Sequence, residues 1–238
     1  MTGRQFRRFA AATFTLATQL CHAEPASVVP LEESAYRLSR GILELGDARF
    51  VAKPIPGREG CYSYQYVARP SGIVRLVIGE ISEKSLFCVI DGRLRSEHFE
   101  FVRADRPKSN FSLDFDWIKG VVRTDRGELR QLDDNMVDRL TMQLVVRRWV
   151  IERGGQPGEA ILPLTMVEDD RAPTYQFRIV ARESVAVPAG NFEAVRVERV
   201  DSKKKSTRFW IAPARDWTAV RVEQVKEGDE QLRMVLTK

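Results

Sequence analysis

The sequence predicts a β-rich protein, mainly antiparallel β with one helix, whose curved sheet or open half-barrel wraps on a single amphipathic helix. Three observations support this fold class. Apolar and polar residues alternate with a period of two along most of the chain, which is typical of half-buried strands. Short turns containing glycine separate these runs, and such turns favour antiparallel neighbours over crossover connections. One segment, residues 133–150, has helical spacing instead.

The first 23 residues have the three regions of a secretory signal peptide. Three arginines form the positive region, an apolar stretch runs from Phe9 to Leu20, and Ala23 provides the small residue that cleavage requires. We therefore expect export by a cleavable signal peptide, cleavage after Ala23, and a periplasmic protein. The three arginines that cleavage removes reduce the formal net charge from +5 to +2.

Two further parts follow this segment. Residues 24–34 are polar and contain two prolines, so we expect a flexible lead-in, and residues 35–238 are expected to form a single β-rich domain. No apolar run in the mature chain reaches the length of a transmembrane span. Because a nearly balanced charge lacks the basic stripe that nucleic acid requires, we expect no nucleic-acid partner. The one dense basic run, Lys203–Lys205, lies between two strand-like segments and is expected to form a solvated hairpin tip.

The predicted strands follow from alternating residues, and the predicted hairpins follow from turn chemistry. Within each alternating run, the apolar residues are expected to share one face of the sheet. The runs are Tyr62, Tyr64 and Tyr66; Phe99 and Phe101; Phe111, Leu113, Phe115 and Trp117; Tyr175, Phe177 and Ile179; and Leu232, Met234 and Leu236. The turns are expected at Asp91-Gly92, Asp125-Arg126-Gly127, Pro188-Ala189-Gly190 and Glu227-Gly228-Asp229.

The helix is predicted over Asp134–Val150, because its apolar positions fall at helical spacing and Asp133, Asp134 and Asn135 are suitable N-caps. A strand is expected to follow, beginning near Trp149 or after Gly158. We expect the helix to cover the concave side of the sheet with Leu140 and Leu144 at the centre of the contact. Replacing either leucine by alanine is then predicted to reduce stability by ~2–5 kcal/mol in thermal melts.

Cys61 and Cys88 are the two cysteines that remain after cleavage. An even pair in an oxidising compartment is compatible with a disulfide. Turn signals at Pro70-Ser71-Gly72 and Glu83-Lys84 indicate two bends between the cysteines, which makes their strands next-nearest neighbours unless sheet closure brings them together. Next-nearest strands are too far apart for a bridge, so we expect two free thiols.

Few residues carry recognisable chemistry. His98 is the single histidine of the mature chain and lies on the polar side of its strand, and no nucleophile-elbow motif accompanies it. Asp114 and Asp116 share a strand face at a separation of ~7 Å, which suits acid/base work on a glycoside but is also the solvent side of an amphipathic strand. Glu168–Asp170 lacks the spacing of a calcium loop. Glycine-rich phosphate loops are missing from the sequence, and we expect no metal and no cofactor.

Several short motifs resemble the bacterial family catalogued as domain of unknown function 3108. The motifs are Tyr62–Tyr66 (YSYQY), Ile90–Leu94 (IDGRL), Phe115–Trp117 (FDW), Asp138–Leu140 (DRL), Arg182–Val197 (RESVAVPAGNFEAVRV), Phe209–Ile211 (FWI) and Ala219–Glu223 (AVRVE). One departure is Trp217-Thr218, where the family pattern has leucine-proline. The resemblance covers roughly residues 36–236. It implies a periplasmic curled sheet around a helix, similar to the half-barrels of lipoprotein carriers, and it implies no catalytic residues.

Function follows from these exclusions only in outline. The leading hypothesis is a non-enzymatic envelope protein that binds an apolar, lipid-like ligand or a partner protein in the half-barrel. One alternative is an envelope carbohydrate hydrolase that uses Asp114 and Asp116, which requires the two carboxyls to meet in a cleft with raised pKa values. The other is a structural assembly partner engaged through a sheet edge.

Overall fold

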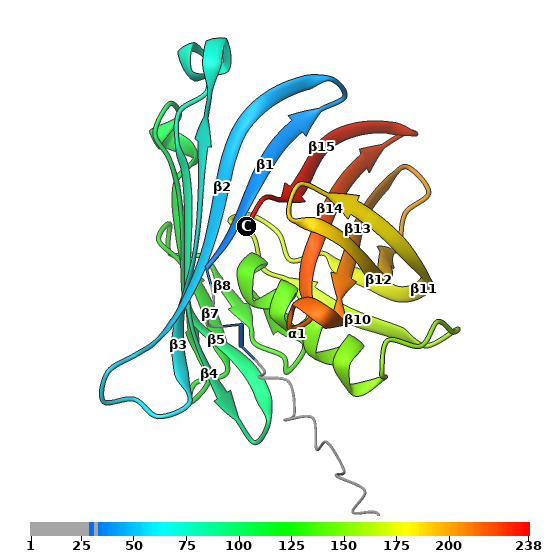
Figure 1. The fold of residues 1–238 in the computed structure, drawn as a ribbon. Coiled ribbons are helices and arrows are strands. Elements are labelled where there is room, and N and C mark those ends of the chain that lie inside the picture. The colour runs from blue at the N-terminus through cyan, green and yellow to red at the C-terminus, as the bar shows by residue number, and fades with distance from the viewer. Residues whose placement is uncertain (1–28, 31–32) are drawn as a thin grey trace, which may run out of the picture.

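A computed structural model describes residues 29–30 and 33–238 of this chain, and these residues form one open sheet around a single α-helix (Figure 1). The predicted fold class is confirmed. The sheet has 15 strands, and every neighbouring pair is antiparallel except β9 with β10. The predicted signal peptide and its cleavage point after Ala23 lie outside the described residues.

The first half of the sheet is a tall wall made by consecutive strands. It comprises β1 (Ser34–Arg40), β2 (Leu43–Pro54), β3 (Cys61–Pro70), β4 (Ile81–Ile90), β5 (Arg93–Arg103), β6 (Phe111–Asp116), β7 (Val121–Thr124) and β8 (Leu129–Gln131), with the short 3-10 turns η1 (Gly72–Leu76) and η2 (Pro107–Ser109) between strands. These strands pair in sequence order, so each contacts the strand before it and the strand after it. We call this half the first wall.

The second wall faces the first at an angle and is joined to it where β1 pairs with β15 (Figure 1). From that junction outward it comprises β15 (Asp229–Leu236), β14 (Thr218–Lys226), β13 (Lys205–Ala212), β12 (Gly190–Arg199), β11 (Thr174–Val187), β10 (Ile161–Met166) and β9 (Met136–Val137), with the 3-10 turn η3 (Pro213–Arg215) between β13 and β14. The Tyr36–Leu236 pair sets the register at the junction.

The sheet does not close, and its two edges are very short. β8 has three residues and β9 has two, and residues 132–135 connect them directly. Short edge strands offer few free backbone groups to another chain, which is a common protection against edge-to-edge association.

The predicted hairpins are present because the turn residues match the backbone angles that the turns require. Asp91 and Gly92 have φ values of 49° and 70° between β4 and β5, and Glu227 and Gly228 have 54° and 92° between β14 and β15. Two consecutive positive φ values are the signature of the tight hairpin turn whose twist matches that of the strands. Lys203 and Lys204 lie in the connection between β12 and β13, and Lys205 is exposed at the start of β13.

The helix α1 extends over Arg139–Glu152, so it begins five residues later than the predicted Asp134. The N-cap is Asp138 and not one of the three polar residues at 133–135. The intervening Met136 and Val137 form β9, since they pair with Thr165 and Met166 of β10. Trp149 lies in the helix, and the next strand begins at Ile161, after Gly158.

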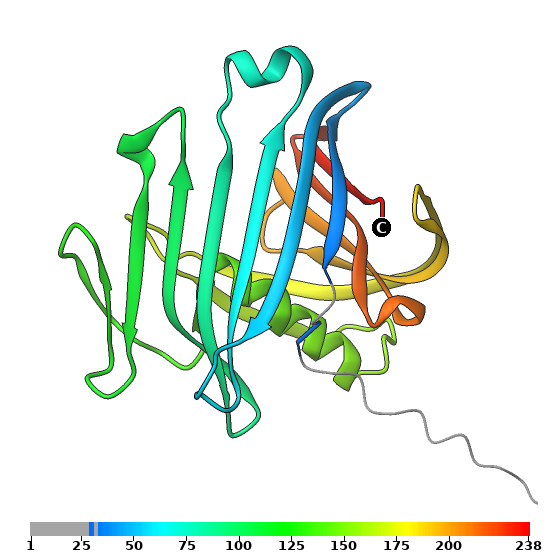
Figure 2. The ribbon, with the colours of Figure 1, turned by 60° about the vertical axis from the view of Figure 1, so that its left-hand side comes forward.

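The helix crosses the space between the walls and is buried on two sides (Figure 2). As predicted, Leu140 and Leu144 are fully buried, and they belong to the core that the helix shares with the first wall. Met142, Val146 and Trp149 pack into a second core against the second wall. Of the helix residues only Glu152 is exposed, so α1 joins the two walls through opposite faces.

Part of the predicted flexible lead-in packs against the fold. Val29 is 1% exposed and belongs to the same core as Leu140 and Leu144, and Pro30 lines a cavity beside α1. The first strand begins at Ser34, the last residue of the predicted lead-in.

The expectation of two free thiols is wrong in this structure, in which Cys61 and Cys88 form a disulfide. The two residues face each other directly in the register of β3 with β4, so the strands are immediate neighbours. Only one bend separates them, because Glu83 and Lys84 lie inside β4 and do not form a turn. Glu83 is buried and accepts a hydrogen bond from Arg139 of the helix, which explains why a glutamate occurs in the middle of this strand.

Candidate functional site

The start of α1 is fixed by a fully buried carboxylate. Asp138 Oδ1 accepts hydrogen bonds from the backbone N–H groups of Leu140 (2.8 Å) and Thr141 (2.9 Å), which are otherwise unpaired groups of the first helical turn. Asp138 Oδ2 accepts hydrogen bonds from the hydroxyls of Ser85 (2.7 Å), Ser96 (2.6 Å) and Thr141 (2.7 Å). All five residues are 0% exposed.

These contacts fasten the helix to the first wall, since Ser85 belongs to β4 and Ser96 to β5. Ser96 Oγ also accepts from the Asp138 N–H at 3.0 Å, and its carbonyl accepts from Trp117 Nε1 at 2.7 Å. A carboxylate is tolerated in the interior only when such donors surround it. The cluster is therefore a structural clamp for α1, closed to any ligand.

A buried ion pair supports the same end of the helix. Arg139 Nη1 lies 2.7 Å from Glu83 Oε1, and Glu83 is 4% exposed on β4. Burial raises the pKa of the Glu83 carboxyl, and the facing Arg139 guanidinium partly offsets that shift. Removing Arg139 alone would leave Glu83 buried without a counter-charge, which is costly.

The interior also holds a cavity of about 50 Å³ between α1 and both walls. Its lining is mostly apolar: Pro30, Ser34, Tyr36, Phe50, Tyr64, Gln143, Leu144, Val146, Arg147, Phe209, Ile211, Trp217, Thr218, Ala219, Val222 and Met234. The volume is well below the roughly 300 Å³ at which small-molecule pockets begin, so the cavity has no room for such a ligand in this structure.

Aromatic side chains of the first wall form one side of this cavity. The Tyr36 and Phe50 rings meet edge to face at 5.5 Å, and Phe50 lies 5.7 Å from Tyr64 and 4.7 Å from Tyr66. Burial raises the pKa of both Tyr36 and Tyr64, and the Tyr36 hydroxyl donates to the Ala219 carbonyl at 2.9 Å. Of the predicted tyrosine stripe, Tyr64 reaches the cavity and the other two pack against the core.

Among the described residues that line the cavity, one side chain is charged. Arg147 on α1 is 4% exposed, and its Nη2 contacts both the Asp216 carbonyl (2.7 Å) and Asp216 Oδ2 (3.1 Å). Burial lowers the pKa of the Arg147 guanidinium, and the Asp216 charge works against that shift. The cavity therefore combines an aromatic wall with one buried cation.

The loop that supplies Asp216 is strained. Asp216 and Trp217 are consecutive non-glycine residues with φ values of 45° and 53°. A left-handed conformation costs about 1–2 kcal/mol for a residue with a side chain. Trp217 lines the cavity, so one of these two strained residues forms part of its wall.

The predicted carboxylate pair is not brought into a cleft. Asp114 lies on the outer face of the first wall, where its Oδ1 is 2.7 Å from His98 Nδ1. Lys119 lowers the pKa of Asp116, since its backbone N–H donates to that carboxylate at 3.0 Å and its ammonium lies at 3.1 Å. Neither aspartate lines the interior cavity. A lowered pKa on an outer face is the opposite of what the hydrolase hypothesis requires.

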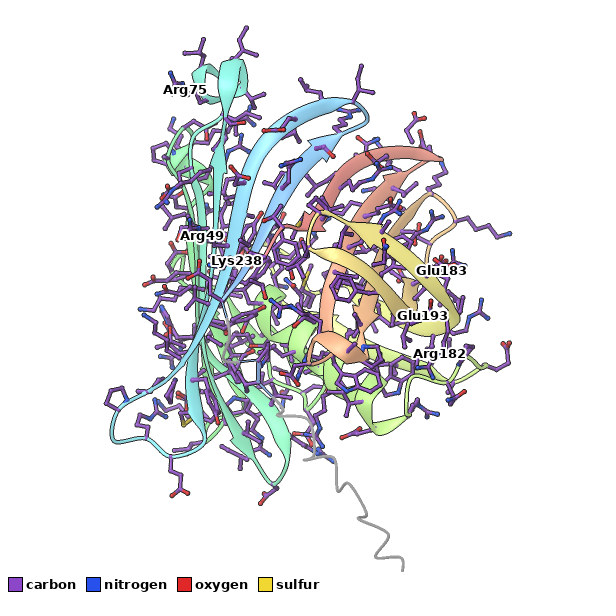
Figure 3. The ribbon with its side chains drawn as sticks, in the orientation of Figure 1. Arg49, Arg75, Arg182, Glu183, Glu193 and Lys238 are labelled. Carbon is purple, nitrogen blue, oxygen red and sulfur yellow. A yellow bond between two sulfur atoms is a disulfide. The ribbon has the colours of Figure 1, made fainter. Side chains whose placement is uncertain are left out.

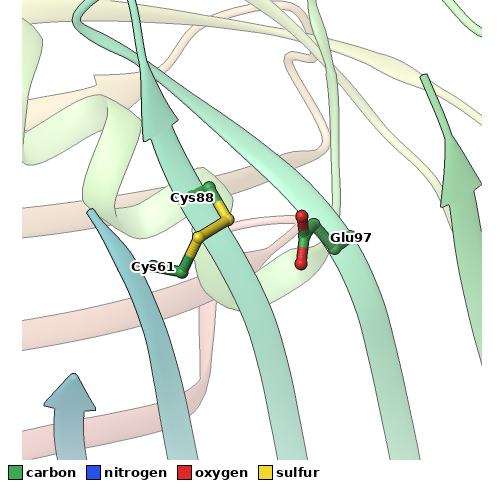
Figure 4. Close-up of side chains that lie close together, drawn as sticks. All are labelled: Cys61, Cys88 and Glu97. Carbon is green, nitrogen blue, oxygen red and sulfur yellow. A yellow bond between two sulfur atoms is a disulfide. The ribbon is translucent and has the colours of Figure 1, made fainter. Parts of the chain in front are cut away.

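The other chemical candidates have structural partners. In the turn between β10 and β11, Glu168 pairs with Arg171. Asp169 of the same turn pairs with Arg126, which lies in the turn between β7 and β8. Across residues 29–30 and 33–238, one group has metal-ligand spacing: Cys61, Cys88 and Glu97, within 4.8 Å of one another (Figure 4). Its two sulfurs are bonded to each other, and Arg58 pairs with Glu97 at 2.7 Å.

Sequence patterns alone did not indicate Arg147, Asp216 or the capping role of Asp138. A signal was available for Asp138, since it precedes Arg139, Leu140 and Thr141 as a good N-cap residue. Arg147 lies at a position where a charged helix residue is usually exposed. Its burial depends on the second wall, which sequence patterns do not place against the helix.

Comparison with known protein families identifies the family of this chain. The family model described as "Protein of unknown function (DUF3108)" matches residues 35–237. The chain belongs to the DUF3108 family. This membership confirms the resemblance seen in the short motifs. No curated protein matches the chain.

Solved structures similar to this DUF3108 protein have low sequence identity to it. A β-barrel-like protein of the DUF1849 family from Brucella abortus has a TM-score of 0.50 at 12% identity, over 87% of this chain and 95% of that one. A protein described as exported, with a YmcC-like fold, from Bacteroides fragilis has a TM-score of 0.42 at 13% identity, over 87% and 93%. The first likeness supports the fold alone.

No helix in the described part of this DUF3108 chain combines the length and the apolar character that crossing a bilayer demands.

Proposed function

We propose that this chain is an exported, non-enzymatic envelope protein that holds an apolar, lipid-like ligand with one acidic group between α1 and the two walls. The observation that carries the proposal is the aromatic cavity that the buried Arg147 borders. A mostly apolar lining with a small number of well-placed polar groups is the usual composition of a small-molecule site. Tyr36, Phe50 and Tyr64 would contact the apolar part, and Arg147 would pair with the acid.

Entry of such a ligand requires the cavity to enlarge. Residues 213–217 are the segment suited to move, since Trp217 lines the cavity and both Asp216 and Trp217 hold a strained conformation. When this loop moves away, Asp216 leaves Arg147, and the ligand's acidic group takes its place as the counter-charge. The strain released at Asp216 and Trp217 offsets part of the cost of opening.

The two rival functions have less support. The hydrolase requires paired carboxyls in a cleft, whereas Asp114 pairs with His98 on the outer face and Asp116 has a lowered pKa. Assembly through a sheet edge requires an edge long enough to pair, whereas β8 and β9 have only three and two residues.

Native mass spectrometry of the protein recovered from the envelope of its own host tests the proposal. We expect an added mass that corresponds to an apolar acid, and we expect it to be lost in Arg147→Met, which keeps the length of the side chain but removes its charge. Asp114→Asn, on the outer face, should retain it. Recovery of the wild-type protein without a bound ligand, or equal occupancy of Arg147→Met, would contradict the proposal.

A further inference from the structure

The first wall carries exposed aliphatic side chains at one end, far from the interior cavity. Ile42 and Leu43 stand at the turn between β1 and β2, and Ile73, Leu76 and Val77 stand in and after η1, between β3 and β4. Ile42 is fully exposed, and the three residues at η1 are 77%, 76% and 74% exposed. We call these two segments, residues 42–43 and 73–77, the aliphatic tips.

The two tips lie side by side at the same end of the sheet. β2 and β3 are paired neighbours, and the Ser71 N–H donates to the Leu45 carbonyl at 3.0 Å just below the tips. Figures 1 and 2 show both tips projecting beyond the rest of the first wall. Single exposed aliphatic side chains are normal on a protein surface. Five of them on two adjacent projecting turns form an apolar patch, which is typical of a binding surface.

Cations without an ion pair accompany these aliphatics. Arg40 precedes the first tip and Arg75 lies within the second, where Figure 3 shows it at the far end of the wall. Both are exposed, and neither makes a salt bridge to another described residue. Three acids beside the tips are already paired: Glu44 with Arg37, Glu80 with Arg69, and Glu230, which accepts from the Gly41 N–H, with Arg233. The local charge available to a partner is therefore positive.

We infer that the aliphatic tips dock this protein on the surface of a bilayer that contains anionic phospholipid. Aliphatic side chains that enter the acyl boundary while neighbouring arginines meet anionic headgroups are the basis of peripheral membrane binding. Two narrow projections suit a deformable bilayer better than a flat protein interface, which needs about 800 Å² of complementary surface on each side. The inference does not depend on the interior ligand site.

Vesicle co-sedimentation of the secreted chain, with its N-terminus checked by mass spectrometry, tests this inference. The tip variant is Ile73→Asp combined with Leu76→Asp. The matched control is Ile118→Asp, because Ile118 is 98% exposed in the turn between β6 and β7 at the opposite end of the first wall. All three substituted positions are exposed, and thermal melts should show unchanged stability.

We expect the wild-type protein and the Ile118→Asp control to bind vesicles of mixed phosphatidylglycerol and phosphatidylcholine. The tip variant should bind at least ~10-fold more weakly, since it places two charges where aliphatic groups enter the bilayer. Pure phosphatidylcholine vesicles and high salt should weaken wild-type binding. Failure of the wild type to bind anionic vesicles, or equal binding of the tip variant, would overturn the inference. So would sedimentation velocity showing a wild-type dimer that the tip variant cannot form.

Discussion

Asp138 Oδ2 and Ser96 Oγ lie 2.6 Å apart in the fully buried space between α1 and β5. This contact joins the carboxylate that caps the helix to a strand against which the helix packs. Because the Asp138 side chain also accepts from two backbone N–H groups, one residue both starts the helix and fixes its position on the first wall.

Replacing Asp138 by alanine is predicted to destabilise the fold by at least ~3 kcal/mol. About 1 kcal/mol comes from the lost N-cap, and the rest comes from the hydroxyls of Ser85 and Ser96 left buried without their acceptor. Chemical denaturation measures the change. Asp134→Ala is the control, since Asp134 is exposed and makes only a surface pair with Arg93. Loss of this exposed pair should reduce the stability of the control by less than ~1 kcal/mol. Equal losses of stability in the two variants would contradict the capping role.

The second prediction concerns the disulfide between Cys61 and Cys88. Thiol labelling of the secreted chain, denatured without reductant, should modify neither cysteine, and labelling after reduction should modify both. The bridge spans a sequence separation of 27 residues, so replacing both cysteines by serine should reduce stability by ~3 kcal/mol. Two modified cysteines in the unreduced sample would show that the thiols are free.

His98 provides a pH-dependent contribution. Partial burial lowers its pKa, but hydrogen bonds to Asp114 and Glu100 outweigh burial, and the net pKa is raised. A raised folded pKa gives stabilisation that is fully present below the unfolded pKa of about 6.5 and is lost as pH rises through the folded pKa. NMR titration of the ring should show a pKa above the ordinary value, and Asp114→Asn should lower it. An unchanged His98 pKa in Asp114→Asn would refute the pairing.

Local chemistry explains which parts of this fold are predictable from sequence. Asp91-Gly92 and Glu227-Gly228 specify their turns within two residues, so the hairpins could be predicted. The helix start could not, because Asp134 and Asp138 are equally good caps by type. The choice depends on Ser85 and Ser96, which are more than 40 residues away along the chain.

The same distinction applies to the candidate site. Alternation correctly placed Tyr64 on the inner face of its strand, because that pattern depends only on neighbouring residues. The proximity of Cys61 to Cys88 was missed because Glu83 and Lys84 resemble a turn, although Glu83 is matched by Arg139 on the helix. Arg147 and Asp216 come from segments 69 residues apart, and no local pattern connects them.

The most direct test of ligand binding between α1 and the walls uses Trp217, which lines the cavity, as a reporter. A brominated long-chain fatty acid quenches tryptophan fluorescence only at short range. We predict saturable quenching of the wild-type protein that is largely lost in Trp217→Phe, although Trp117, Trp149 and Trp210 remain, and no such quenching by the unbrominated acid. Quenching that does not saturate, or that is equal in Trp217→Phe, would contradict the proposed site.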